Sequence, residues 1–417
     1  MLTGRKYRLA LDAEQTEMCE EFGNICRAVW NTGLDQRRQY RRRGAWMNYV
    51  PQVAELADAK KEHPWLRAAP SHVLQQTLKD LDKACRDHGA FRVRWRSKAR
   101  WSPSFRFPAG NLITVERLGR KWGRAKLPKL GWVTFRWSRP LGGEVRSATV
   151  SRRSGHWYLS FLVSTQETTP EQHAMPNTAV GMDRGVAVAA TTSDGDFHDR
   201  QFVTEGEKTR YRRLQQQLAR TKKGSANRRK VLARMNRIMG RVSDRRADFC
   251  AHLANRLTAR NAVVVLEDLK TKNMTASASG TRQKPGKQVS QKRGLNRAIL
   301  DKGWHRLELA LANAARYTGT ELVKVHPAYT SQRCSACGFA TGGNRESQSA
   351  FVCKAVGCGY RQNADVNAAR NILKAAGAAV SACGDFGATR SVKQELPGPR
   401  EAVPVRPAIP LVGIPRP

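Results

Sequence analysis

Four cysteines in the last third of the chain have the spacing of a metal site. Cys334 and Cys337 form a Cys-x-x-Cys pair, and Cys353 and Cys358 form a second pair that is two residues longer. Glycine follows each pair, as expected for tight turns that direct two thiolates at one ion. Four thiolates at such spacing suit a tetrahedral Zn²⁺ ion, so we predict one structural zinc. Free or disulfide-bonded cysteines are the alternative, which the scattered positions of the other five cysteines do not favour.

Three acidic residues in the second half stand where secondary structure could carry them to one place. Asp183 lies within an apolar run, Glu267 ends the aliphatic run 262–267, and Asp365 begins a helical segment after the second cysteine pair. A buried carboxylate is costly unless it is compensated, and a metal ion is one such partner. Taken alone, Asp183 is explained equally well as a turn residue. Taken together, three converging carboxylates can hold two Mg²⁺ ions about 4 Å apart, which would hydrolyse a phosphodiester without a Ser or Cys nucleophile.

The elements that must position these acids follow from the apolar pattern of the second half. Apolar runs bounded by turn residues predict buried strands, and apolar residues at helical spacing predict helices. The resulting order of strand, hairpin, helix pair, strand, helix, strand, insertion and helix is the layout of an RNase H-like α/β fold. The predicted elements are a strand, turn and returning strand over 178–194, a third strand from Phe197, a helix pair over 208–246 with a turn at 223–225, a strand over 262–267, a polar mobile loop over 270–297, a helix over 300–317 and a strand over 321–325.

The formal charge of +40 points to a polyanionic partner, because Lys and Arg outnumber Asp and Glu by 74 to 34. Nucleic acid is the expected partner of such a chain, and a generally basic, solvated surface is the alternative. The basic residues also cluster, since residues 208–246 hold fifteen Lys or Arg and one acid, Asp244. We therefore predict that this helix pair lines phosphates, with Arg228, Arg229 and Lys230 among its contacts.

The first half of the chain predicts a helical lobe inserted into a small β-barrel. Residues 4–10 alternate basic and apolar side chains like a strand, and a helix that Asp12 could cap follows. A second helix spans 71–85, and its polar face carries Gln75 and Gln76. Solvated glutamines are the simpler interpretation of this face, and contacts to DNA base edges are the alternative. Further strands are predicted over 91–107, 112–115, 132–137, 147–152 and 156–165.

Residues 91–107 interleave cations with aromatic rings. Basic side chains at every second position predict a strand with one cationic and one apolar face. The rings among them offer stacking surfaces for single-stranded or structured RNA. The residues predicted to contact nucleic acid here are Arg92, Arg94, Arg96, Lys98, Arg100 and Trp101.

The sequence shows no sign of export or membrane insertion. Its first residues lack the apolar segment of a secretory signal, and no run of 18 apolar residues occurs. Cysteines that bind a metal must stay reduced, so we expect a cytoplasmic protein without a membrane partner. Residues 168–177 are typical of a linker, and the proline-rich residues 386–417 predict a disordered tail.

Four motifs of this chain resemble those of TnpB, an RNA-guided DNA endonuclease encoded by insertion sequences and related to the type V CRISPR nucleases. They read V-G-M-D-R-G-V-A-V, V-V-L-E-D-L, T-S-Q-R-C-S-A-C-G and N-A-D-V-N-A-A-R-N-I, within a likeness that covers residues 1–385. The resemblance implies that Asp183, Glu267 and Asp365 are the acids of a RuvC nuclease domain. It also implies cleavage of double-stranded target DNA beside a short transposon-adjacent motif, directed by a guide RNA made from the end of the element.

The resemblance also implies a domain organisation and a set of partners. The helical lobe and barrel would read the adjacent motif, and Gln75 and Gln76 would take part. We expect two catalytic Mg²⁺ ions, one structural Zn²⁺ ion, a guide RNA and a monomer in the bacterial cytoplasm, at the nucleoid when bound to DNA. The implied domains are a wedge β-barrel over 1–10 and 89–170, a helical recognition lobe over 11–88, a RuvC nuclease over 178–328 and 362–380, a zinc ribbon over 329–361 and the tail over 386–417.

Three other functions share parts of this pattern. A catalytically silent RNA-guided repressor would bind DNA without cutting it, but the presence of all three acids favours a nuclease. A true transposase could use a two-metal acidic triad as well, although the embedded ribbon and the RNA-like surfaces argue against it. A compact type V CRISPR effector nuclease has the same sequence features, and only the neighbouring genome separates it from a transposon protein.

Overall fold

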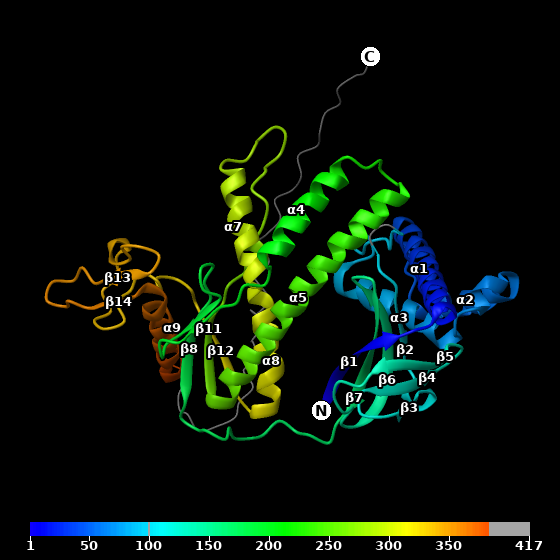
Figure 1. The fold of residues 1–417 in the computed structure, drawn as a ribbon, viewed down its shortest axis with the longest axis horizontal. Helices are drawn as coiled ribbons and strands as arrows, with labels where there is room; N and C mark the ends of the chain where they lie inside the picture. The colour runs from blue at the N-terminus through cyan, green and yellow to red at the C-terminus, as the bar shows by residue number, and fades with distance from the viewer. Residues whose placement is uncertain (99–100, 383–417) are drawn as a thin grey trace, which may run out of the picture.

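The computed structural model describes residues 1–98 and 101–382, with its two large sheets at opposite ends of the molecule (Figure 1). A seven-stranded sheet and the first three helices form one end, and a five-stranded sheet with the last helix forms the other. The long helix α5 (Ala226–Arg260) runs between these ends beside α4 (Glu205–Ala219). None of the helices in the described part is both long and apolar enough to cross a membrane. The tail predicted over 386–417 lies outside the described residues.

The first sheet consists of antiparallel strands in the order β2-β6-β7-β1-β5-β4-β3. Residues of β7 alternate along the strand, so that Leu159, Phe161 and Val163 are buried in the core. The small β-barrel predicted for this part does not close: among the described residues the outer strands β2 and β3 do not pair, and the sheet stays open. The strands are β1 (Leu2–Ala10), β2 (Ser104–Phe107), β3 (Thr114–Arg117), β4 (Trp122–Leu127), β5 (Gly131–Arg136), β6 (Glu144–Arg153) and β7 (His156–Ser164), with a short 3₁₀ turn η2 (Gly110–Leu112).

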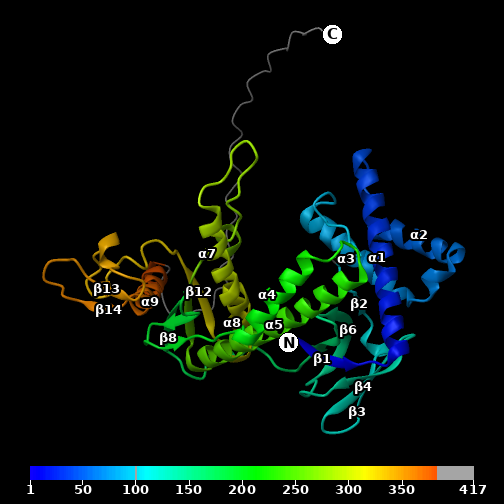
Figure 2. The same ribbon diagram turned by 45° about the horizontal axis from the view of Figure 1, so that its top comes forward.

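The helical lobe shares one apolar core with this sheet. Helix α1 begins at a capping box in which the backbone N–H of Gln15 donates to the Asp12 carboxylate at 2.7 Å, which confirms the predicted cap. Figure 2 shows α1 rising from the sheet with α2 on its outer side. The prediction missed α2. The elements of the lobe are α1 (Ala13–Arg42), α2 (Tyr49–Glu62), η1 (Pro64–Arg67) and α3 (Ser71–His88).

The strand predicted to begin at residue 91 is wrong up to residue 98, where the structure is irregular. Side chains of α1 form hydrogen bonds with backbone groups of this segment that a neighbouring strand would otherwise have paired with. Asn31 donates to the carbonyl of Arg96 at 3.1 Å and accepts from its N–H at 2.9 Å. Arg38 donates to the carbonyl of Val93 at 2.7 Å. A strand forms only at β2, beyond Arg100, which itself lies outside the described residues.

The second sheet has the order β10-β9-β8-β11-β12, in which β8, β11 and β12 are parallel. Its two faces are covered differently. Val264 and Leu266 of β11 pack with α5 and α8, whereas Val265 between them packs with Ile372 of α9. This alternation is why the aliphatic run at 262–267 is buried from Val264 to Glu267. The elements are β8 (Ala179–Asp183), β9 (Ala190–Thr192), β10 (Phe197–His198), β11 (Val263–Glu267), β12 (Glu321–Val325), α8 (Trp304–Thr318) and α9 (Ala364–Ala382).

Between β11 and α8 the chain is more ordered than the mobile loop predicted over 270–297. A short helix α6 (Thr271–Met274) follows β11, and α7 (Val289–Lys302) begins well inside the predicted loop. The single helix predicted over 300–317 is therefore two helices, separated by Gly303 in the left-handed conformation at φ 75°. Polar composition concealed α7, because one residue of this helix, Ile299, is buried.

Helix α9 and strand β8 approach each other so closely that only glycine fits between them. A Cβ on residue 181 would lie 2.2 Å from the carbonyl oxygen of Ala369 and 2.8 Å from the backbone nitrogen of Leu373. Neither backbone atom can move without displacing α9. This contact fixes the N-terminal turn of α9, where Asp365 lies, against the strand that ends at Asp183.

We predict that Gly181→Ala lowers the free energy of unfolding by about 1–3 kcal/mol, because overpacking a rigid contact forces backbone shifts. Urea denaturation of the two proteins measures this difference. Gly4→Ala is the matched control, since no atom lies within 4 Å of a Cβ at that strand position. Equal stability of Gly181→Ala and Gly4→Ala would mean that α9 moves freely on β8.

Candidate functional site

The three acids predicted from the sequence meet at one edge of the second sheet. Asp183 ends β8 and Glu267 ends β11, and these strands are parallel neighbours in which Met182 lies beside Leu266. Asp365 lies in the first turn of α9, which packs on the same strands. The C-terminal ends of two parallel strands and the N-terminal turn of one helix therefore bring the carboxylates together.

The pKa of Asp183 shows how close these groups are. Burial first, and then the negative charges of Glu267 and Asp365, together raise the pKa of Asp183 to about 7. Burial also raises the pKa of Glu267. Mutual repulsion in a water-poor site favours the protonated forms. The negative charge of the three acids is therefore not fully neutralised by their neighbours, and a divalent cation would neutralise it.

Two residues that the sequence did not reveal act directly on these acids. The Arg345 guanidinium forms an ion pair with the Asp365 carboxylate at 3.0 Å, and its charge lowers the pKa of Asp183. The hydroxyl of Thr330 donates to Glu267 Oε1 at 2.6 Å in a buried contact. Arg345 belongs to the polar interval between the cysteine pairs, where no spacing distinguishes it. Thr330 is the first residue of a quoted motif, but nothing in that motif points to Glu267.

Buried asparagines of α9 hold the segment that carries Thr330. Asn371 donates to the carbonyl of Thr330 at 2.9 Å. Asn367 donates to the carbonyl of Arg333 at 2.8 Å and accepts from the N–H of Ser335 at 2.9 Å. The first cysteine turn is thus bonded to the same helix that carries Asp365.

The four cysteines gather as predicted. Their sulfur atoms all lie within 4.8 Å of one another, with Cys337 and Cys353 3.6 Å apart and Cys334 and Cys358 3.9 Å apart. A tetrahedral ion with Zn–S bonds of about 2.3 Å requires nearly this spacing, whereas a disulfide would be far shorter. The thiols titrate differently without an ion: a hydrogen bond from the backbone at Phe339 helps to lower the pKa of Cys337 to about 7, whereas burial raises the pKa of Cys353 to about 12.

The longer second cysteine turn does not disturb this cluster. The N–H of Cys358 donates to the carbonyl of Ala355 at 3.2 Å, and Val356 projects fully into solvent. Gly357 and Gly359 both adopt positive φ, at 79° and 59°. The extra residues therefore extend outward, while the sulfurs converge. The ribbon is completed by β13 (Ala350–Val352), β14 (Arg361–Asn363) and a 3₁₀ turn η3 (Gly342–Asn344).

The carboxylates are spaced differently from the thiolates. Among the described residues, the four cysteines form a group whose ligand atoms all lie within 4.8 Å of one another. The oxygen atoms of the three acids do not form such a group. Carboxylate oxygens are the ligands that hard divalent cations such as Mg²⁺ prefer. The chemistry of these donors therefore suits a divalent cation.

The residues predicted to contact nucleic acid separate into exposed and internally bonded groups. Arg96 is largely buried between the rings of Trp30 and Trp101, with its guanidinium 3.7 Å and 5.3 Å from their centroids. Gln76 donates to Asp80 at 2.8 Å, and Arg228 donates to the carbonyl of Leu218 at 2.8 Å. Gln75 is half-buried. The side chains exposed to solvent are Arg92, Arg94, Lys98, Arg229 and Lys230.

We predict that the purified protein holds one zinc ion per chain. Elemental analysis measures it, and Cys353→Ser should lose the ion because a structural zinc site needs all four ligands. Limited proteolysis of this variant should then cut within 329–361. Cys85→Ser, which changes a cysteine outside the cluster, is the control and should keep the metal. Folded protein without zinc would contradict the assignment.

Comparison with known proteins agrees with this geometry. Family models match residues 1–45 (helix-turn-helix domain), 160–278 (probable transposase) and 304–372 (Cas12f1-like, TNB domain). The last of these stretches contains the four cysteines, Arg345 and Asp365. The structure over residues 1–45 is the strand β1 followed by the single long helix α1.

One solved structure shares the fold of nearly the whole chain. It is described as a cryo-EM structure of the Cas12f1-sgRNA-target DNA complex, and it superposes with a TM-score of 0.54 at 13% identity. The match covers 87% of this chain and 83% of that one. At this identity the likeness concerns the fold alone.

Two relatives match almost from end to end. A protein of Escherichia coli (strain K12) named "Putative RNA-guided DNA endonuclease InsQ" is 38% identical over 94% of this chain and 96% of its own length. A protein of Streptomyces pristinaespiralis named "Putative RNA-guided DNA endonuclease" is 33% identical over 99% of this chain and 98% of its own length. Identity at this level, over this length, places the chain in the TnpB family of insertion-sequence proteins.

Proposed function

We propose that this protein is an RNA-guided DNA endonuclease of an insertion sequence, which cuts DNA beside a short transposon-adjacent motif. The observation that carries the proposal is the convergence of Asp183, Glu267 and Asp365 at one sheet edge in a member of this family. The names of the two full-length relatives support it. A repressor without cleavage would have no use for three repelling acids, two of which, Glu267 and Asp365, are buried.

We assign the second sheet and its helices to an RNase H-like nuclease domain of the RuvC type. The parallel strands β8, β11 and β12 and the antiparallel β9 and β10 support this assignment. The cysteine cluster supports a zinc ribbon between β12 and α9. The proposed boundaries remain those implied by the sequence, namely 1–10 and 89–170 for the wedge, 11–88 for the recognition lobe, 178–328 and 362–380 for the nuclease and 329–361 for the ribbon.

The three acids would hold Mg²⁺, which when bound activates the attacking water and stabilises the leaving 3′ oxygen of a phosphodiester. The chain's own residues prepare this site. Thr330 fixes one oxygen of Glu267 and leaves the other free, because its hydroxyl occupies Oε1. Arg345 places a positive charge beside Asp365, where the phosphodiester of a bound strand would lie. Arg184, itself buried, donates to the carbonyl of Glu267 and so fixes the end of β11.

Binding of guide RNA and double-stranded target DNA would rest on the basic surfaces. Helix α5 carries exposed Arg229 and Lys230, and the irregular segment after α3 carries exposed Arg92, Arg94 and Lys98. Phosphate contacts of this kind supply affinity without reading sequence. We propose a cytoplasmic monomer.

A compact CRISPR effector is the second candidate, favoured by the Cas12f1 fold. The end-to-end identity to insertion-sequence relatives favours the transposon assignment over it. Sequencing the RNA that co-purifies with the protein separates the two, because a transposon end and a repeat array give different guides.

We predict that Asp183→Ala, Glu267→Ala and Asp365→Ala each abolish cleavage while target binding survives. Recognition rests on guide pairing and phosphate contacts, not on these acids. Cleavage and gel-shift assays on the same guide-loaded variants, with Mg²⁺ present, measure both properties. Asp268→Ala is the control, because its half-exposed side chain pairs weakly with Lys324 at 4.0 Å. Full cleavage by any of the three variants would remove that acid from the site.

We predict that Thr330→Val lowers the cleavage rate by about tenfold, as expected when a partner that orients a metal ligand is lost. The substitution keeps the shape of the side chain and removes the hydroxyl that donates to Glu267. Thr330→Ser should restore most of the rate, and neither variant should change target affinity. If Thr330→Val and Thr330→Ser lost the same activity, packing rather than the hydrogen bond would be responsible.

A further inference from the structure

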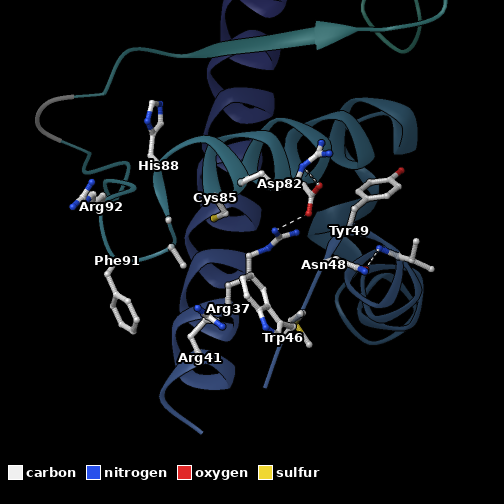
Figure 3. Close-up of a pocket in the computed structure, with 15 residues that line it drawn as sticks. Arg37, Arg41, Trp46, Asn48, Tyr49, Asp82, Cys85, His88, Phe91 and Arg92 are labelled. Carbon is white, nitrogen blue, oxygen red and sulfur yellow. Dashed lines mark hydrogen bonds and ion pairs between the residues drawn. The ribbon is translucent and has the colours of Figure 1, made fainter. Parts of the chain in front are cut away.

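A cavity of about 1010 Å³ opens in the helical lobe, and Figure 3 shows the residues that line it. Its walls come from the last turns of α1, the segment that joins α1 to α2, and the end of α3 with the residues after it. This volume exceeds that of one nucleotide and lies at the upper end of the range for small-molecule sites. None of the residues predicted from the sequence to bind DNA bases lines it.

Two aromatic side chains stand exposed at this cavity. Trp46 is 79% exposed and Phe91 is 57% exposed, which is unusual for large apolar side chains in one hollow. The guanidinium of Arg41 lies 3.6 Å from the centre of the Trp46 ring. Figure 3 shows Trp46 and Phe91 projecting on the two sides of α1. Exposed rings beside arginines are the surfaces on which proteins stack unpaired bases.

The net positive charge of the residues that line the cavity favours an anionic ligand. Four arginines line the cavity against one acid, Asp82. Arg37 and Arg86 already pair with Asp82 at 2.8 Å and 3.2 Å, so Arg41 and Arg92 remain without an acidic partner in the lining. A phosphate group beside these two residues would meet their charge.

Arg37 fixes the wall of the cavity. Its side chain is 4% exposed, and its Nε and Nη1 donate to Gln52 and Asp82, both at 2.8 Å. The Cys85 thiol beside it is a further hydrogen-bond partner of this side chain. Arg37 therefore holds α1, α2 and α3 together behind the cavity, and its charge adds to the positive charge of the lining.

We propose that this cavity binds an unpaired nucleotide of a single strand, with its base stacked on Trp46 or Phe91 and its phosphate beside Arg41 and Arg92. The proposal rests on the proposed function, because a guide RNA and an opened target duplex both supply single strands. Bound in this way, one nucleotide would anchor the strand to the recognition lobe at a distance from the cleavage site.

Ultraviolet crosslinking of the full-length, guide-loaded protein tests this assignment and identifies the source of the nucleotide. The sample is irradiated with and without target DNA, and adducts are mapped by mass spectrometry. We expect an adduct on the peptide that contains Trp46 or on the peptide that contains Phe91. A ribonucleotide adduct assigns the site to the guide, and a deoxyribonucleotide adduct assigns it to the target. Absence of both adducts from a preparation that cuts its target would overturn the proposal and leave the proposed function intact.

Affinity measurements on matched variants give a second test that does not depend on cleavage. Trp46→Ala should weaken binding of the crosslinked strand by about tenfold, the usual loss for one stacked base, and Trp46→Phe should retain most of the affinity. Trp65→Ala is the control, because Trp65 is half-exposed on the same lobe and does not line this cavity. Folding is not at risk, since Trp46 lies almost wholly in solvent. Equal losses in Trp46→Ala and Trp65→Ala would exclude a specific stacking site.

Discussion

Asp183, Glu267 and Asp365 repel one another in a region from which water is largely excluded, and the architecture of the second half works against that repulsion. Glycine at position 181 lets α9 approach β8 to backbone contact, so Asp365 cannot withdraw from Asp183. Arg184 holds the end of β11, and Arg345 partly neutralises the cluster. The remaining imbalance, seen in the raised pKa of Asp183, is what prepares this edge of the sheet for divalent cations.

The segment that carries the four cysteines is part of this arrangement rather than an appendage. Two groups that touch the acids, the hydroxyl of Thr330 and the guanidinium of Arg345, belong to the stretch between β12 and α9. Asn367 and Asn371 tie the same stretch to α9 through buried hydrogen bonds. Loss of zinc would therefore loosen the groups that orient two of the three carboxylates, even though the thiolates lie outside the acidic site.

The basic charge of the chain serves two different purposes. Some arginines are internal: Arg96 stacks between two tryptophans, and Arg38 replaces a strand partner for the segment after α3. Others stand free on α5 or beside the cavity at the end of the lobe. The donors of Arg38 bond backbone carbonyls of that segment, which have no strand partner. The exposed ones remain for phosphates.

The sequence by itself identified the acids and the cysteines that come together in the fold. Cysteine spacing and the acids at the ends of apolar runs are local patterns, and a buried strand or a metal turn needs little beyond its own residues to be recognised. The order of elements in the second half followed from the same periodicities, as did the Asp12 cap. Tertiary structure decided what depends on distant partners. The alternating segment from Arg92 has the pattern of a strand, but its backbone forms hydrogen bonds with Asn31 and Arg38 of α1 instead of with another strand. The expected barrel stays open, because its outer strands do not pair. Arg345 and Thr330 act on the acids across the fold, and the cavity at Trp46 joins three segments, so no pattern along the chain could have revealed them.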